Sequence, residues 1–161
     1  MDAENMEFPE AYFDFVWSRG VINHSSDTRR ALAEITRVLW PGRRFIAMVY
    51  HKLLEHPVRG GLCYGVLEGQ FFRGYSLHEI IQDSTDGALA RYDTIPQWHE
   101  ALGPGLTVQS TKVFGSRSQL VPIPMGAIKA QLMKAIPARI GRMVTNRPFF
   151  GFMVTTDAIR Q

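Results

Sequence analysis

Three side chains suited to proton transfer or ring recognition stand at the ends of short apolar runs. His24 follows the run Phe13–Ser18, and the run Arg44–Tyr50 ends in Tyr50, with His51 next. A histidine titrates near neutral pH, so His24 could orient or deprotonate a substrate group. It could equally cap or pack beneath the helix that follows. Tyr50 and His51 could line a pocket, although aromatic residues at a strand end often only border the core.

Other kinds of site find little support in the residue spacing. The five histidines show no His-x-x-x-His spacing on one helix, and the single cysteine, Cys63, offers no pair of thiolates. Zinc needs three or four converging ligands, so we expect no metal site. The Gly-x-Ser-x-Gly motif of serine hydrolases is absent. A net charge of +3 with scattered arginine pairs gives little reason to expect nucleic-acid binding.

The composition is that of a globular domain in a reducing compartment. No apolar run in the 161 residues approaches the roughly 20 that cross a bilayer. The acidic start does not look like a signal or transit peptide, and one cysteine gives no disulfide framework. We therefore expect a cytoplasmic protein without a membrane span.

The elements that would position these side chains follow from apolar periodicity. Phe13–Ser18 is rich in strand formers and predicts a buried strand. Asp27–Leu39 carries apolar residues on one face and predicts a helix that Pro41-Gly42 stops. Arg44–Tyr50 predicts a second buried strand. A strand–helix–strand unit of this kind belongs to an α/β fold with a parallel sheet.

The rest of the chain predicts an irregular helical stretch and then strand, helix and strand. Glycines interrupt residues 51–105 and weigh against long helices there. Two capping-box sequences open short helices in that stretch, at Ser76 with Glu79 and at Thr94 with Gln97. Leu106–Phe114 and Phe149–Thr156 predict strands, with a helix around Ile128–Met143 between them. No linker divides the chain, so we expect one domain over residues 1–161.

The N-terminal third carries a recognisable pattern. It consists of Asp2-Ala3-Glu4-Asn5-Met6-Glu7-Phe8-Pro9, then Phe13-Asp14-Phe15-Val16-Trp17-Ser18-Arg19-Gly20-Val21-Ile22-Asn23-His24, then Ala31–Phe45. Over residues 2–50 this pattern resembles class I S-adenosylmethionine-dependent methyltransferases of the methyltransferase 11 type, a broad set that acts on small molecules. The family's usual Lys-Pro-Gly-Gly turn is Trp40-Pro41-Gly42-Arg43 here. Further on, Thr85-Asp86-Gly87 and Ala90-Arg91-Tyr92 look like a segment of some members.

The resemblance implies a Rossmann-like, doubly wound sheet that binds ligands beyond the carboxyl ends of its strands. Asp2 and Ala3 match the family's loop along the adenine of S-adenosylmethionine. Ser18 matches the strand-end position that contacts the methionine part, and Gly20 lets the chain pass close to it. His24 would then orient or deprotonate the methyl acceptor.

On the acceptor side the resemblance leaves Tyr50 and His51 as candidate pocket residues. Asp86 lies in a glycine-flanked loop that could fold over the site or simply turn the chain.

In the family's numbering, the strands Phe13–Ser18 and Arg44–Tyr50 would be parallel strands 4 and 5. Leu106–Phe114 and Phe149–Thr156 would be the antiparallel strands 6 and 7, with the last strand next to strand 5. Strands 1–3, the glycine-rich cofactor turn and the ribose carboxylate have no counterpart, and no Gly-x-Gly-x-x-Gly occurs. The expected domain is thus the C-terminal half of a methyltransferase: core motifs in 1–50, an irregular cap in 51–105, and strand–helix–strand in 106–161.

The expected reaction is methyl transfer from S-adenosylmethionine to an unidentified, small-molecule acceptor. This chain alone is expected to be inactive, because the glycine-rich cofactor motif is missing. The alternative is a non-catalytic half-domain that binds a partner, or a second copy of itself, through the unpaired edge of its first strand.

Overall fold

An amphipathic helix between two parallel strands forms the first third of the chain, as the periodicity predicts. β1 (Phe13–Arg19) leads into α1 (Thr28–Val38) and then β2 (Leu39–Tyr50). β1 and β2 pair in parallel, with Val16 opposite Phe45. The predicted N-cap region is confirmed, since the side chain of Asp27 accepts a hydrogen bond from the backbone N–H of Arg30.

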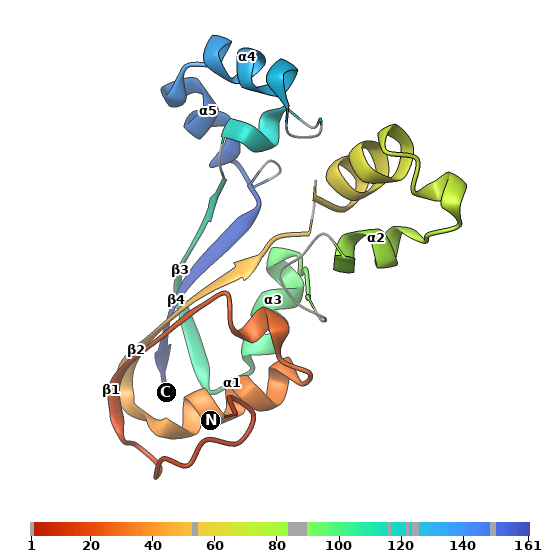
Figure 1. Ribbon diagram of the computed structural model, residues 1–161. Coiled ribbons are helices and arrows are strands. Elements are labelled where there is room, and N and C mark those ends of the chain that lie inside the picture. The colour runs from red at the N-terminus through yellow and green to blue at the C-terminus, as the bar shows by residue number, and fades with distance from the viewer. Residues whose placement is uncertain are drawn as a thin grey trace. The chain divides into compact units, whose positions relative to one another are not determined.

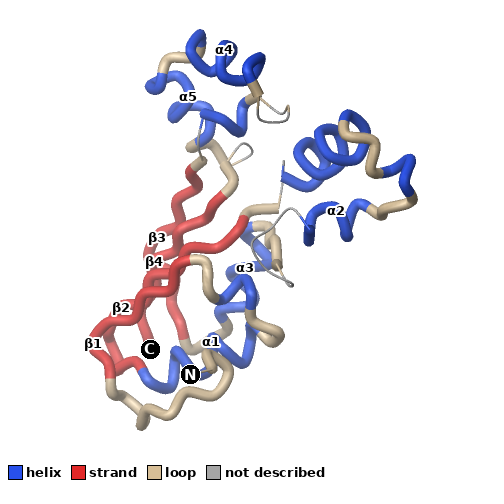
Figure 2. Tube along the Cα trace, viewed as in Figure 1, coloured by secondary structure: helices blue, strands red, loops and turns tan. Residues whose placement is uncertain are grey.

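The computed structural model describes residues 2–52, 55–83, 90–115, 117–121, 123, 126–148 and 151–161 (Figures 1 and 2). The chain forms two compact units. The sheet unit comprises Met1–Tyr50, Arg91–Lys112 and Val154–Gln161, and the helical unit comprises His51–Ala90 and Val113–Met153.

Four strands form one mixed sheet. β3 (Leu106–Phe114) and β4 (Met153–Arg160) join the first two in the order β1-β2-β4-β3, so the last strand lies next to β2 as expected. Backbone N–H groups of Phe152 and Gln161 donate to the carbonyls of Phe114 and Gly105, both over 3.1 Å. Residue numbers thus rise along β4 from 152 to 161 while those of their partners fall from 114 to 105, so β3 and β4 are antiparallel. The final strand begins four residues later than the sequence predicts.

Helices α1 and α3 (Ile95–Leu102) cover one face of this sheet (Figure 1). The buried side chains between them are Ala31, Leu32, Ile35 and Val38 of α1, Phe45, Ala47 and Val49 of β2, Val154, Thr156 and Ala158 of β4, and Trp98 and Leu102 of α3. Burial of this apolar surface, at about 25 cal/mol per Å², is the main force that holds the unit together. α3 begins with the predicted capping box of Thr94 and Gln97.

Two predictions about β1 and β2 are wrong. β1 is not a buried strand, because it lies at the edge of the sheet, and Phe15 and Trp17 are 50% and 63% exposed on the face away from Phe45. α1 ends at Val38 with an extended C-cap, before the Pro41-Gly42 pair. That pair lies inside β2 instead, where the strand pairing is irregular.

The irregularity in β2 has a local explanation. The pairing passes from Phe13 opposite Leu39 to Phe15 opposite Arg44, so the β2 side holds extra residues as in a β-bulge. Gly42 adopts φ 76°, which a glycine takes at little cost. Arg43 then forms an ion pair with Asp14 across the strands at 3.1 Å.

The first part of the helical unit contains η2 (Glu55–Leu67), η3 (Phe71–Arg73) and α2 (Leu77–Asp83). The sequence predicted only short helices here because of its glycines, yet η2 is a π-helix of 13 residues. A Cβ at Gly60 would meet the Ile81 side chain at 2.6 Å, and one at Gly65 would meet the Phe71 ring at 2.2 Å. These glycines therefore permit close packing. The Ser76 and Glu79 capping box is confirmed.

The second part of the helical unit contains η4 (Arg117–Leu120), α4 (Ala127–Ala135) and α5 (Ala138–Thr145). The single helix predicted around Ile128–Met143 is two helices, because Pro137 lacks the N–H that would continue the first. Ile128 is 72% exposed, so its helical spacing does not mark a buried face. Within the described residues, no helix is long and apolar enough to cross a membrane.

Candidate functional site

The carboxyl ends of β1 and β2 lie side by side because the strands are parallel. Ser18 is buried near the end of β1, opposite Ala47. Gly20 follows with φ 65° and donates its N–H to the carbonyl of Met48 over 3.1 Å. A Cβ at Gly20 would meet nothing within 4 Å, so the backbone of this turn can be closely approached.

Three half-buried rings gather beyond these strand ends and form what we call the aromatic cluster: His24, Tyr50 and Tyr92. The His24 and Tyr50 ring centroids are 5.8 Å apart at an interplanar angle of 87°, an edge-to-face contact. Tyr50 and Tyr92 stack at 5.1 Å and 23°. The backbone N–H of Asp93 donates to the carbonyl of Tyr50 over 3.3 Å, which holds the Tyr92 segment against the end of β2.

Asn23 brings an unsatisfied amide next to the aromatic cluster. It precedes His24 in η1 (Ile22–His24), and its carbonyl accepts a hydrogen bond from the Arg91 N–H at 2.9 Å. The side chain is only 3% exposed, and neither Oδ1 nor Nδ2 has a hydrogen-bond partner in the described part of the chain. A buried polar group without a partner costs about 1–3 kcal/mol. A ligand or an ordered water that reached this amide would recover that energy.

The loop with Asp2 and Ala3 forms a tight turn at the start of the described chain. Asp2 is exposed and Ala3 is half-buried. The Asp2 carbonyl accepts from the Asn5 N–H at 3.3 Å, and its Oδ1 accepts from the Glu4 N–H at 2.9 Å. These bonds leave one carboxylate oxygen of Asp2 without a bond of its own in this turn.

The Glu4 carboxylate joins this turn to the segment that follows His24. Its Oε1 accepts hydrogen bonds from Ser25 Oγ at 2.7 Å, Ser26 Oγ at 2.7 Å and the Asp27 N–H at 2.9 Å. These donors, led by the backbone N–H of Asp27, lower the pKa of Glu4 from 4.5 to about 2. The structure therefore brings the Asp2-Ala3 loop to the segment that begins next to His24.

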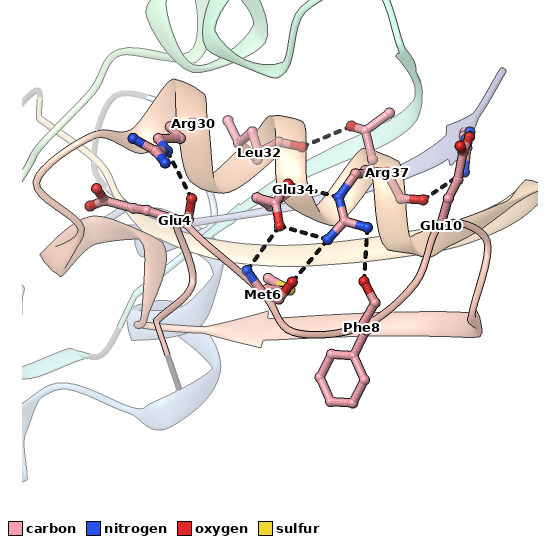
Figure 3. A network of polar contacts seen from close by, with 10 residues as sticks. Glu4, Met6, Phe8, Glu10, Arg30, Leu32, Glu34 and Arg37 are labelled. Carbon is pink, nitrogen blue, oxygen red and sulfur yellow. Dashed lines mark hydrogen bonds and ion pairs between the residues drawn. The ribbon is translucent and has the colours of Figure 1, made fainter.

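A second network fixes the rest of the N-terminal loop to α1 (Figure 3). Glu34 and Arg37 form a bidentate ion pair at 2.8 Å, and the Met6 N–H donates to Glu34 Oε2 at 2.8 Å. The Arg37 guanidinium also donates to the carbonyls of Met6 and Phe8 at 3.0 and 2.8 Å. The Arg37 hydrogen bonds and then the Met6 N–H lower the pKa of Glu34 to about 2.

His51 belongs to the helical unit. Its ring is buried, and the ring Nδ1 lies 2.9 Å from the carbonyl oxygen of Gly151. The backbone N–H of His51 donates to the carbonyl of Phe152 at 2.7 Å. Asp86 lies outside the described residues. Within the residues that the structure does describe, no group of three or more histidine, cysteine or acidic side chains could hold a metal ion.

The structure adds three residues that the sequence reasoning missed: Glu4, Asn23 and Tyr92. Tyr92 lay in a segment that resembled some family members, but 42 positions separate it from Tyr50, and no periodicity predicts a contact at that range. Asn23 and Glu4 lay inside the pattern itself without any signal of their own. Their roles follow only from their neighbours in space.

Comparisons with known proteins match about a third of the chain by sequence. A family model described as "Methyltransferase domain" matches residues 1–47. An uncharacterised methyltransferase from Bacillus subtilis, YcgJ, is 41% identical over 56 residues, which are 35% of this chain and 22% of that protein. A protein of Oryza sativa subsp. japonica, named as a probable chloroplastic tocopherol O-methyltransferase, is 40% identical over 55 residues, 34% of this chain and 15% of its own. The chain thus spans about a fifth or less of the length of these relatives.

Comparison of folds extends the likeness to the whole chain. A solved structure of an S-adenosylmethionine-dependent methyltransferase from Mesorhizobium loti matches with a TM-score of 0.60 at 15% identity. The match covers 99% of this chain and 67% of that one. Residues 1–47 thus resemble a methyltransferase domain by sequence, and the whole chain shares the fold of this methyltransferase structure.

Proposed function

We propose that this chain serves methyl transfer from S-adenosylmethionine to a small-molecule acceptor, with the ligands held beyond the carboxyl ends of β1 and β2. When bound, the cofactor supplies an electrophilic methyl group on a sulfonium. The proposal rests on one observation: the turn at Gly20, the aromatic cluster and the Asp2-Ala3 loop converge on the same end of two adjacent parallel strands. Ligands of doubly wound sheets bind at that end.

The residues present fit the cofactor on two counts. An adenine needs a hydrogen-bond acceptor for its exocyclic amine and a backbone that the ring can approach, and exposed Asp2 followed by small Ala3 offers both. The methionine part needs a turn without side-chain bulk, and Gly20 leaves open space where a Cβ would stand. Ser18 would orient that part from the end of β1.

On the acceptor side, the aromatic cluster would hold the substrate. Tyr50 and Tyr92 present a stacked pair, to which a flat or apolar acceptor could add its own surface. His24 would orient the nucleophilic atom or remove its proton. The relative from Oryza sativa, named as a probable tocopherol O-methyltransferase, supports a small-molecule acceptor.

We also propose that this chain alone binds the cofactor weakly and does not turn over. The sequence has no glycine-rich cofactor turn, and the edge of β1 is exposed where further strands could pair. Hydrogen bonds to charged groups are worth roughly 1.5–3 kcal/mol each. Two missing bonds of this kind would weaken binding by about two to four orders of magnitude.

We propose the cytoplasm as the location of this protein.

Titration calorimetry with S-adenosylhomocysteine tests both parts. We expect weak binding that Asp2→Asn weakens further, while Glu7→Gln, an exposed charge in the same loop, leaves it unchanged. Micromolar affinity would show that this chain carries a complete cofactor site and refute the proposed weakness. No response at millimolar ligand would refute the cofactor assignment itself.

The exposed edge supports a second candidate, a non-catalytic module that pairs with a partner strand. Phe15 and Trp17 on this edge strand are at least half exposed, and an unpaired edge of this kind invites strand addition. Sedimentation velocity across concentration tests self-association. Phe15→Lys should then abolish any dimer, since charged residues on an edge strand discourage pairing.

A further inference from the structure

Glu4 connects two loops that the proposed function assigns to different ligands. Its backbone belongs to the Asp2–Asn5 turn, and its carboxylate accepts three hydrogen bonds from Ser25, Ser26 and Asp27. The Glu4 carbonyl also accepts from Arg30 Nε of α1 at 2.9 Å (Figure 3). Main chain and side chain are thus both anchored to the start of α1.

Residues 25–27, which hydrogen-bond to Glu4, lie in a segment that is also held by Arg91, next to Tyr92 of the aromatic cluster. The Arg91 guanidinium donates to the carbonyl of Ser26, and the Arg91 N–H donates to the carbonyl of Asn23. His24 lies between these two carbonyls in the sequence and contacts Tyr50 through its ring. A shift of residues 25–27 would therefore move the backbone that carries His24.

A simpler explanation is that Glu4 only caps α1. Asp27 already does so through its own side chain, which accepts from the Arg30 N–H at 3.1 Å. Glu4 instead takes two hydroxyls and the N–H of the N-cap residue itself, all outside the helix. Its contacts suit a link between loops better than a helix cap.

We infer that Glu4 is a positioning residue that couples adenine binding at Asp2-Ala3 to the placement of His24. The inference rests on the proposed function of these loops. A ligand that orders the turn at residues 2–5 fixes the Glu4 carboxylate, and the carboxylate then fixes residues 25–27. By thermodynamic linkage, a fixed His24 loop favours adenine binding to the same extent.

The test compares Glu4→Ala with Glu7→Ala in the full chain. Both remove a carboxylate from the same loop, but only Glu4 accepts the three hydrogen bonds from residues 25–27, and Glu7 is exposed. The probe is S-adenosylhomocysteine at up to millimolar concentration. NMR follows the backbone amides of residues 2–5 and the ring nitrogens of His24, and thermal unfolding follows stability.

In the unmodified chain and in Glu7→Ala, the ligand should shift both residues 2–5 and the His24 ring. In Glu4→Ala, the loop should still respond while the His24 response is lost. Affinity should fall about fivefold, at the low end of ordinary coupling between sites. A Ser25→Ala and Ser26→Ala double variant removes two of the three donors from the other side and should reproduce most of this loss.

Several results would overturn the inference. If His24 responds equally in Glu4→Ala and the unmodified chain, Glu4 only stabilises the fold, even where the unfolding temperature falls. If the ligand shifts residues 2–5 but never His24, the coupling fails while the proposed cofactor site stands. If the ligand shifts neither, both proposals fail.

Discussion

The hydrogen bond between α3 and β4 gives the sharpest prediction of stability. Trp98 Nε1 donates to Thr156 Oγ1 at 3.0 Å, and both side chains are 1% exposed. Thr156→Val keeps the branched shape that suits a strand but removes the acceptor. The indole N–H is then buried without a partner, and such a group costs about 1–3 kcal/mol. Against a typical total of about 5–15 kcal/mol, this is a large fraction of the stability.

Urea unfolding of four variants separates this hydrogen bond from packing. Thr156→Ser keeps the hydroxyl and loses one methyl group, which we expect to cost about 0.5–1.5 kcal/mol. Thr156→Val should cost more than that. A double-mutant cycle of Thr156→Val, Trp98→Phe and the double variant should show a coupling free energy of about 1 kcal/mol or more between the two side chains. If Thr156→Val is no worse than Thr156→Ser, or the cycle shows no coupling, the hydrogen bond does not stabilise the docking of α3.

The remaining predictions concern packing and acid. Leu32→Ala empties a buried site under the sheet and should lower the free energy of unfolding by about 2–5 kcal/mol in urea titrations. Gly151→Ala would place a Cβ 2.0 Å from a valine methyl group and 2.8 Å from a backbone carbonyl, so it should cost about 1–3 kcal/mol or more. Gly126→Ala meets nothing within 4 Å and changes only the N-cap of α4, so it should cost less than Gly151→Ala; equal effects would refute the packing argument. Arg37 lowers the pKa of Glu34 from 4.5 to about 2, so the stabilisation is present above pH 4.5 and disappears as the pH falls through 2. The stability difference between the unmodified chain and Glu34→Gln should shrink over that window, and a constant difference would contradict the pKa.

Local signals predicted the first third of the chain well, because its elements are determined by residues close in sequence. The periodicity of Asp27–Leu39 gave α1, and the capping box at Thr94 gave α3. The strand order came from the family resemblance and is confirmed, although the final strand lies further along the chain.

The misses have a common physical origin in contacts between distant residues. Glycines argued against a helix at Glu55–Leu67, but Gly60 and Gly65 lie where neighbouring side chains approach too closely for a Cβ. Phe15 and Trp17 looked like core residues, but their exposure depends on β1 being at the edge of the sheet. Neither fact can be read from a window of neighbouring residues.

For the candidate site, the sequence predicted which residues follow the strand ends but not which side chains contact one another there. His24 and Tyr50 were predicted individually, and the structure places their rings in contact. Tyr92 completes the aromatic cluster from a segment 42 residues beyond Tyr50. That these side chains act on a substrate remains a prediction.

The hydrogen bond from the Asp27 N–H to the Glu4 carboxylate joins two residues far apart in the sequence, and this has a consequence for the order of folding. An isolated α1 could close its first turn with Asp27 alone, but the N–H of Asp27 gains its partner only when a residue 23 positions earlier arrives. Closing such a loop costs chain entropy, and this cost is offset only once the hydrogen bond has formed. We expect the Glu4 contacts to form after the folding transition state, so that Glu4→Ala speeds unfolding and leaves the folding rate nearly unchanged. The N-terminal loop would then be the first part of the sheet unit to open and the last to close.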